Sequence, residues 1–162
     1  MAIGDALASL LMTQRGFNKE DFARNHPGGE LGKQLSLKVE SLMHPLNEVA
    51  QINEHDSIRE CANKMTANPL GAALLLENGS LKGIVTEGDL RKSIASNLDL
   101  SNSIEPFIND NPISIHSSVS ILDAMKIMED RSSKISCLPV VDSDGKCLGL
   151  LTIHDLYQTK LV

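Results

Sequence analysis

Two stretches of the chain carry apolar residues at the spacing of an amphipathic helix. They share the pattern Ser-Ile-x-x-small-x-x-x-Met, once as Ser57-Ile58-x-x-Cys61-x-x-x-Met65 and once as Ser120-Ile121-x-x-Ala124-x-x-x-Met128. Serine is a favoured helix N-cap residue, so each pattern predicts a helix that begins directly after its serine. The two predicted helices are equivalent and are offset by 63 residues.

Short apolar runs of strand length follow each helix. Residues 72–76 and 138–141 form the first of these runs, and each run leads into turn residues, at 77–79 (ENG) and 142–145 (DSDG). A second apolar run follows each turn, at residues 81–86 and 147–152, and a closing helix is expected to start at Asp89 or Asp155. With a first strand before each helix, at residues 48–50 and 112–115, each unit is predicted to run β-α-β-β-α.

The end of the second hairpin strand carries a motif that occurs twice. Residues 83–90 (GIVTEGDL) and 149–156 (GLLTIHDL) both read G-h-h-T-x-x-D-L, where h is apolar, at an offset of 66 residues. Since the helices are offset by 63, the second copy should carry three extra residues after its helix, within residues 129–134. A unit of roughly 55 residues cannot bury both faces of a small sheet alone. We therefore expect the two units to pack sheet against sheet, with the functional site between them.

Composition and charge restrict the possible functions. The 162 residues are 41% hydrophobic and 22% charged, which is typical of a globular protein. The net charge of −6 argues against a nucleic-acid partner, because binding to phosphate backbones requires a basic surface. No apolar run reaches the ~18 residues of a membrane helix, so no membrane association is expected.

The cysteines and histidines suggest no metal site. The three cysteines form no C-x-x-C pair, which favours reduced packing residues and a cytoplasmic location. The five histidines show no H-E-x-x-H motif and no Cys/His pairing at ligand spacing. We therefore predict neither a metal nor a cofactor.

The repeated G-h-h-T-x-x-D-L motif resembles the signature of paired cystathionine-β-synthase (CBS) domains. The resemblance covers residues 39–162 and implies an α+β fold, a tandem CBS pair of two β-α-β-β-α units packed sheet to sheet. The expected boundaries are residues 38–98 for the first CBS domain and residues 99–162 for the second. Such pairs commonly associate in twos, so a homodimer is expected, and a tetramer in the parent protein.

The leading segment is similar to another family. Apolar residues at positions 3, 6, 7, 10 and 11 predict a helix that ends at Arg15-Gly16. The stretches 4–7 (GDAL), 15–17 (RGF) and 21–32 (DFARNHPGGELG) resemble the end of the sugar-isomerase domain of bacterial D-arabinose-5-phosphate isomerases. Residues 1–37 would then be the C-terminal helices and linker of a truncated sugar-isomerase domain.

That resemblance implies a metabolic setting. Members of the family interconvert arabinose 5-phosphate and ribulose 5-phosphate for the synthesis of Kdo, a sugar of lipopolysaccharide or capsule. Only His26, in the His-Pro-Gly-Gly motif, resembles one of their active-site residues, as a base or acid in a neighbouring subunit. The phosphate-binding loop lies upstream of this chain, so we predict that the chain alone is catalytically inactive.

The repeated threonine and aspartate have two interpretations. Thr86 with Asp89, and Thr152 with Asp155, are residue types that cap helices. The CBS resemblance implies that the aspartate holds the ribose hydroxyls while the threonine and helix N-terminus hold phosphate. Only the first copy has adjacent positive charge, at Arg91 and Lys92, so Asp89→Ala is expected to weaken a ligand more than Asp155→Ala.

Two further sets of residues complete the predicted site. Arg91 could grip a phosphate or carboxylate, or belong to a solvated helix face. The resemblance also implies that residues beside the first strands recognise the base, which gives three candidates: Val49, Ala50 and Ile113.

Several functional hypotheses follow. The chain could be a regulatory module that binds a nucleotide or nucleotide sugar, with CMP-Kdo, CMP, AMP and ATP as ligand candidates. Alternatively it could act as an adenine-nucleotide energy sensor, or as a dimerisation module whose cleft stays empty. The remaining possibility is that isomerisation by the parent enzyme is its relevant function.

Overall fold

The computed structural model describes Gly4, residues 10–16 and residues 37–159. The chain divides into two units, Met1–Leu37 and Lys38–Val162. In the first unit, residues 10–14 are helical, and Gly16 has a φ of 61° while its N–H donates to the Thr13 carbonyl at 3.2 Å. A glycine in this left-handed conformation ends the helix where the sequence predicts. His26 lies outside the described residues.

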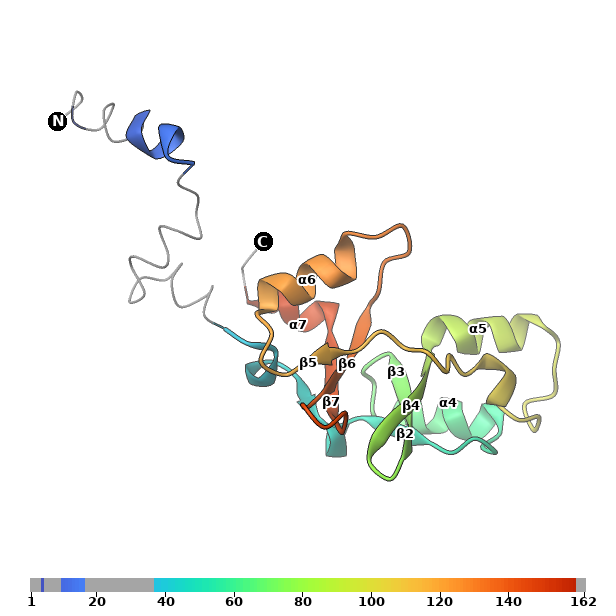
Figure 1. Ribbon diagram of the computed structural model, residues 1–162. Helices are drawn as coiled ribbons and strands as arrows, with labels where there is room; N and C mark the ends of the chain where they lie inside the picture. Colours follow the sequence, from blue (N-terminus) through green and yellow to red (C-terminus); the bar gives the residue numbers. More distant parts are fainter. Residues whose placement is uncertain (1–3, 5–9, 17–36, 160–162) are drawn as a thin grey trace. The chain divides into compact units, whose positions relative to one another are not determined.

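The second unit contains both predicted repeats (Figure 1). The first comprises β2 (Ala50–Ile52), α4 (Ile58–Ala67), β3 (Ala72–Glu77), β4 (Ser80–Thr86) and α5 (Glu87–Ala95). The second comprises β5 (Ile115–His116), α6 (Ile121–Glu129), β6 (Cys137–Val141), β7 (Cys147–Thr152) and α7 (Ile153–Gln158). The order β-α-β-β-α is therefore confirmed in both copies.

The predicted start of each closing helix was two residues late. α5 begins at Glu87 and α7 at Ile153, ahead of the aspartates at which we expected them to start. The reason is that Thr86 and Thr152 are the N-cap residues, so each aspartate lies at the third helical position.

Each sheet is completed by a segment that precedes the other copy. The first sheet has the order β2-β3-β4, and the second has the order β1-β7-β6-β5, where β1 is His44–Pro45. β1 pairs antiparallel with β7, and in the equivalent place Asn109 forms a bridge with Ile84 of β4. Three short 3-10 helices, η1 (Val39–Ser41), η2 (Leu46–Glu48) and η3 (Glu105–Phe107), lie in these connecting segments. The two copies thus exchange their leading segments.

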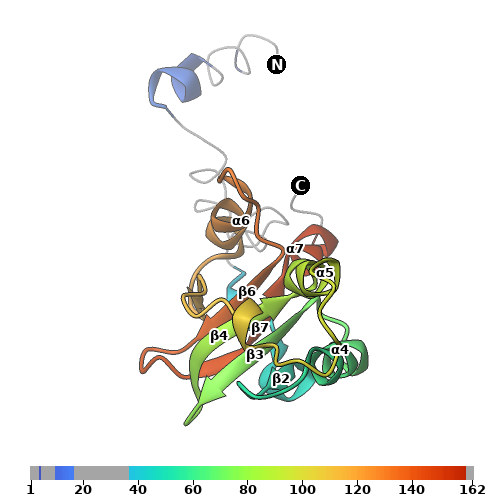
Figure 2. The same ribbon diagram turned by 90° about the vertical axis from the view of Figure 1, so that its right-hand side faces the viewer.

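The core has two kinds of layer because both faces of each sheet are buried. In β3, Ala72 and Leu74 point toward a cluster that also contains Cys137 and Leu150 of the second copy. Ala73 and Leu75 point the other way, toward the α4 residues Ile58, Cys61 and Met65. The sheets therefore pack on each other, and the helix pairs α4/α5 and α6/α7 cover the outer faces (Figures 1 and 2). This arrangement confirms the predicted sheet-to-sheet packing.

The strand register places the extra residues of the second copy more exactly. Ala72 pairs with Thr86 and Cys137 with Thr152, an offset of 65 at the first position, so two extra residues lie between α6 and β6. The third lies in the hairpin turn, where Asn78 and Gly79 are replaced by residues 143–145. From the sequence we placed all three residues directly after the helix, because only the helices and the G-h-h-T-x-x-D-L motifs could be aligned, and the strands between them could not.

Candidate functional site

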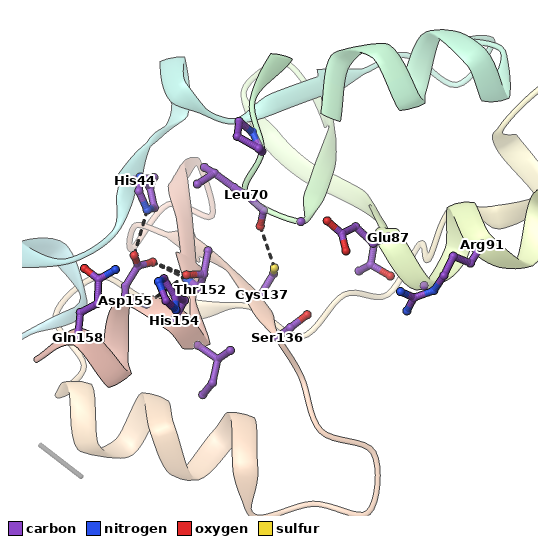
Figure 3. Close-up of a pocket in the computed structure, with 15 residues that line it drawn as sticks. His44, Leu70, Glu87, Arg91, Ser136, Cys137, Thr152, His154, Asp155 and Gln158 are labelled. Atoms are coloured by element: carbon purple, nitrogen blue, oxygen red, sulfur yellow. Dashed lines mark hydrogen bonds and ion pairs between the residues drawn. The ribbon is translucent and has the colours of Figure 1, made fainter. Parts of the chain in front are cut away.

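A cavity lies between the two copies, where their closing helices begin (Figure 3). We call it the main cleft. Its volume is about 790 Å³, within the ~300–1,000 Å³ that small-molecule sites occupy. Thr86, Glu87 and Arg91 line it from the first copy, and Thr152 and Asp155 line it from the second. The repeated motifs therefore meet at one cavity.

Each closing helix begins with a capping box. The Thr86 N–H and Oγ1 donate to Asp89 Oδ2 at 3.0 and 2.6 Å, and the Thr152 N–H and Oγ1 donate to Asp155 Oδ2 at 2.9 and 2.6 Å. The first N–H group of each helix also has a hydrogen-bond partner: Glu87 donates to the Gly71 carbonyl and Ile153 donates to the Ser136 carbonyl. The capping interpretation is thus correct, and it leaves one carboxylate oxygen, Oδ1, on each aspartate.

The two remaining carboxylate oxygens have different partners. Asp89 Oδ1 accepts from Lys92 Nζ at 2.8 Å, and that lysine side chain is 73% exposed. Asp155 Oδ1 lies 3.1 Å from His44 Nε2, with the histidine side chain 30% exposed and the aspartate side chain 16% exposed. The other ring nitrogen of His44 lies 3.3 Å from Glu48 Oε2. His44 therefore joins the leading segment of the first copy to the motif aspartate of the second.

The electrostatics of Asp89 follow from these contacts. Burial works to raise the pKa of Asp89, but hydrogen bonds from Lys92 and from both Thr86 donors outweigh burial and hold the pKa below its usual value. Asp89 is thus a carboxylate at neutral pH.

The structure separates the predicted site residues into groups. Thr86, Arg91, Thr152 and Asp155 line the main cleft, and Figure 3 shows Arg91 at the end opposite Asp155. Asp89 borders neither this cleft nor the smaller cavity described next. Val49 and Ala50 are 4% and 1% exposed and belong to the core, so their side chains do not reach either cavity.

A smaller cavity, which we call the side cavity, adjoins the main cleft. Its volume is about 310 Å³, and it shares the lining residues Thr86, Ser136 and Cys137 with the main cleft. Ile113 lines it and is 39% exposed. Of the three base-recognition candidates, Ile113 alone borders one of these two cavities.

Sequence reasoning missed several residues of the main cleft. His44, Ser136 and Cys137 line it, although none of them belongs to the repeated motif. They reach it because the copies exchange their leading segments and because β3 and β6 begin beside the closing helices. The only signal in the sequence that could have indicated His44 was its position, shortly before a predicted first strand.

All three cysteines are buried free thiols. Burial raises the pKa of Cys61 to about 11, and burial also raises the pKa of Cys137, whose Sγ lies 3.2 Å from the Leu70 carbonyl oxygen. Such thiols are poor nucleophiles at neutral pH. Across residues 37–159, His, Cys, Asp and Glu form no cluster suited to a metal ion. The helices in the described part of the chain are all too short or too polar to cross a membrane.

The sequence profile of the CBS domain matches residues 39–96 and 104–160. The chain belongs to the CBS domain family. Among solved structures, the CBS domain protein of Pyrobaculum aerophilum complexed with AMP is similar at a TM-score of 0.63. It is 26% identical, and the match covers 74% of this chain and 89% of that one. The similarity in fold agrees with the two CBS repeats of the second unit.

Two curated relatives extend the similarity over the leading segment. Arabinose 5-phosphate isomerase KdsD of Pseudomonas aeruginosa is 40% identical over 160 residues, which are 98% of this chain and 48% of the relative. The enzyme of the same name from Francisella tularensis is 36% identical over 99% of this chain and 49% of the relative. The chain thus spans about half the length of the curated relatives it matches.

Proposed function

We propose that this CBS pair binds a nucleotide or nucleotide sugar in the main cleft and thereby regulates an arabinose 5-phosphate isomerase. The observation that carries the proposal is the convergence of Thr152 and Asp155 from one copy with Thr86 and Arg91 from the other at one cavity. The Pyrobaculum aerophilum relative, complexed with AMP, supports a nucleotide ligand. CMP-Kdo, CMP, AMP and ATP are the candidates.

The charges of the cleft suggest how such a ligand lies. A ribose diol can donate to Asp155 Oδ1, and a phosphate or sugar carboxylate can pair with the Arg91 guanidinium at the opposite end (Figure 3). Because Asp155 borders the cleft and Asp89 does not, the ribose role passes to the second copy. We therefore expect Asp155→Ala to weaken ligand binding more than Asp89→Ala, the reverse of what the sequence suggested.

His44 offers a route from ligand to regulation. A ribose that takes Asp155 Oδ1 competes with His44 Nε2 for that oxygen. His44 lies in β1, six residues after Lys38, where the chain enters this unit from residues 1–37. Ligand binding would therefore weaken the His44–Asp155 contact, which anchors the segment that leads to the isomerase part. Such coupling requires that the ligand favour the released arrangement, because equal affinity for both shifts nothing.

The activity itself would belong to a longer protein. We propose that the isomerase activity needs the part of the relatives that this chain does not match, and that the relevant compartment is the cytoplasm. The 162-residue chain should therefore show no turnover of arabinose 5-phosphate. Measurable isomerisation by the purified chain would contradict this assignment.

Calorimetry with CMP-Kdo, CMP, AMP and ATP tests the binding proposal. At least one of these ligands should bind, and Asp155→Ala should weaken it by roughly tenfold or more, the loss expected for hydrogen bonds to a charged group. Asp89→Ala serves as the matched control, since it removes the same motif residue away from the cleft, and it should have a smaller effect. Lack of binding by all four would instead favour a dimerisation module with an empty cleft.

A further inference from the structure

The two copies differ at the first position of their closing helices. Thr86 and Thr152 are the N-cap residues, and the residue that follows is Glu87 in α5 but Ile153 in α7. Both of these following residues line the main cleft. The first copy therefore brings a carboxylate to the cleft where the second copy brings an apolar side chain.

The carboxylate of Glu87 lies in the part of the cleft where the anionic group of a ligand is expected. Glu87 precedes Arg91 by four residues, so the two side chains project from the same face of α5. Figure 3 shows both of them on the side of the cleft away from Asp155. Within the described part of the chain, neither side chain forms a hydrogen bond or an ion pair. A ligand anion at Arg91 would therefore also face an uncompensated carboxylate.

The charge of Glu87 acts on another group of the cleft lining. Burial is the main cause of the raised pKa of the Cys137 thiol, and the negative charges of Glu87 and Asp155 raise that pKa further. A Cβ added at Gly71 would lie 3.5 Å from Cys137 Sγ and 4.0 Å from Glu87 Oε1. The Glu87 carboxylate thus lies beside the lining residues Gly71 and Cys137, although its side chain is exposed.

The described lining of the main cleft contains few cations. Glu87 and Asp155 are carboxylates, Arg91 is the one arginine, and none of the described lining residues is a lysine. Sites for di- and triphosphate chains compensate the ligand charge with several cationic groups or with a metal ion. Here a second or third phosphate would add repulsion from Glu87 without gaining a further arginine or lysine.

We propose that Glu87 is a specificity-determining residue of the main cleft, which favours ligands with one phosphoryl group and disfavours di- and triphosphates. This inference rests on the proposed function, because it concerns the same site. A carboxylate and a phosphate that share one cation repel each other, and the repulsion grows with the charge of the ligand. Among the four ligand candidates, ATP is therefore the weakest.

Two ligand series test the role of Glu87, namely adenosine with AMP, ADP and ATP, and cytidine with CMP, CDP and CTP. Affinities are measured by calorimetry at low ionic strength and without Mg²⁺, so that neither salt nor metal compensates the ligand charge. Glu87→Gln should leave nucleoside binding unchanged, tighten binding of the monophosphate about twofold, and tighten binding of the triphosphate about fivefold or more. This dependence on ligand charge is the result that the proposal requires.

Glu105→Gln is the matched control, since it removes the same charge from an exposed residue of η3 that does not line the main cleft. It should change none of these affinities. If Glu87 only stabilises the N-terminus of α5, its substitution should affect nucleosides and nucleotides alike.

The proposal fails if Glu87→Gln changes all ligands equally or changes none, or if the wild type binds the triphosphate more tightly than the monophosphate. In each of these cases a ligand still binds, so the proposed function stands. Absence of binding by every ligand to both proteins would contradict the proposed function and this inference together.

Discussion

At the scale of single residues, the glycine of the repeated motif has a steric role. A Cβ at Gly149 would lie 2.0 Å from the His44 carbonyl oxygen, because β1 pairs closely with β7 at this point. A Cβ at the equivalent Gly83 would meet the Ile108 Cγ2 methyl at 2.5 Å and the Asn109 carbonyl oxygen at 3.2 Å. In both copies the motif glycine therefore admits the segment that crosses over from the other copy.

Substitution of these glycines should have unequal costs. Gly149→Ala forces a backbone carbonyl to move and should lower the free energy of unfolding by about 1–3 kcal/mol or more. In Gly83→Ala the closest contact is the end of a side chain, which can turn away, so the loss should be smaller. Urea unfolding of both variants measures this difference, and equal stability of Gly149→Ala and the wild type would contradict the close approach of β1.

The site residues were predictable to the extent that the repeat marks them. Thr86, Thr152, Arg91 and Asp155 border the main cleft as the motif suggested. Asp89 occupies the same motif position as Asp155 but does not border the cleft, and its remaining oxygen accepts from Lys92 on its own helix. Motif position alone could not separate these two aspartates.

At the scale of elements, the segment from η1 to β1 connects the leading part of the chain to the second copy. The Val39 and Glu40 N–H groups donate to the carbonyls of Val119 and Ser117, at 2.9 and 3.0 Å. His44 then contacts Asp155. Periodicity could not reveal this exchange, since β1 has only two residues and pairs with a strand more than a hundred residues away. The longer elements α4, α6 and the two hairpins were predicted because their apolar spacing is strong and local.

Hydrogen exchange of residues 38–45 should report ligand binding through this segment. In the wild type, a ligand of the main cleft should change the exchange rates there, because it competes with His44 for Asp155. His44→Ala should bind the ligand at least as tightly but abolish the change. Lys92→Ala, which frees Asp89 in the same way, is the control and should keep the wild-type response. A ligand-dependent change that persists in His44→Ala would exclude this route.

At the scale of the whole molecule, two nearly equivalent repeats form one asymmetric binding unit. The main cleft between them combines Asp155 from the second copy with Arg91 from the first. The asymmetry is visible at the two aspartates, since Asp155 contacts His44, whereas Asp89 pairs with Lys92 of its own helix. Family membership predicts the fold, whereas the proposed ligand site depends on these particular contacts.

A crystal structure of the chain grown with CMP-Kdo, or with whichever nucleotide binds in calorimetry, tests the central claim most directly. We predict ligand density in the main cleft, with a ribose hydroxyl at Asp155 Oδ1, an anionic group at Arg91, and His44 moved away from the aspartate. An empty main cleft beside density elsewhere, or an intact His44–Asp155 contact beside a ligand bound in the main cleft, would contradict the account.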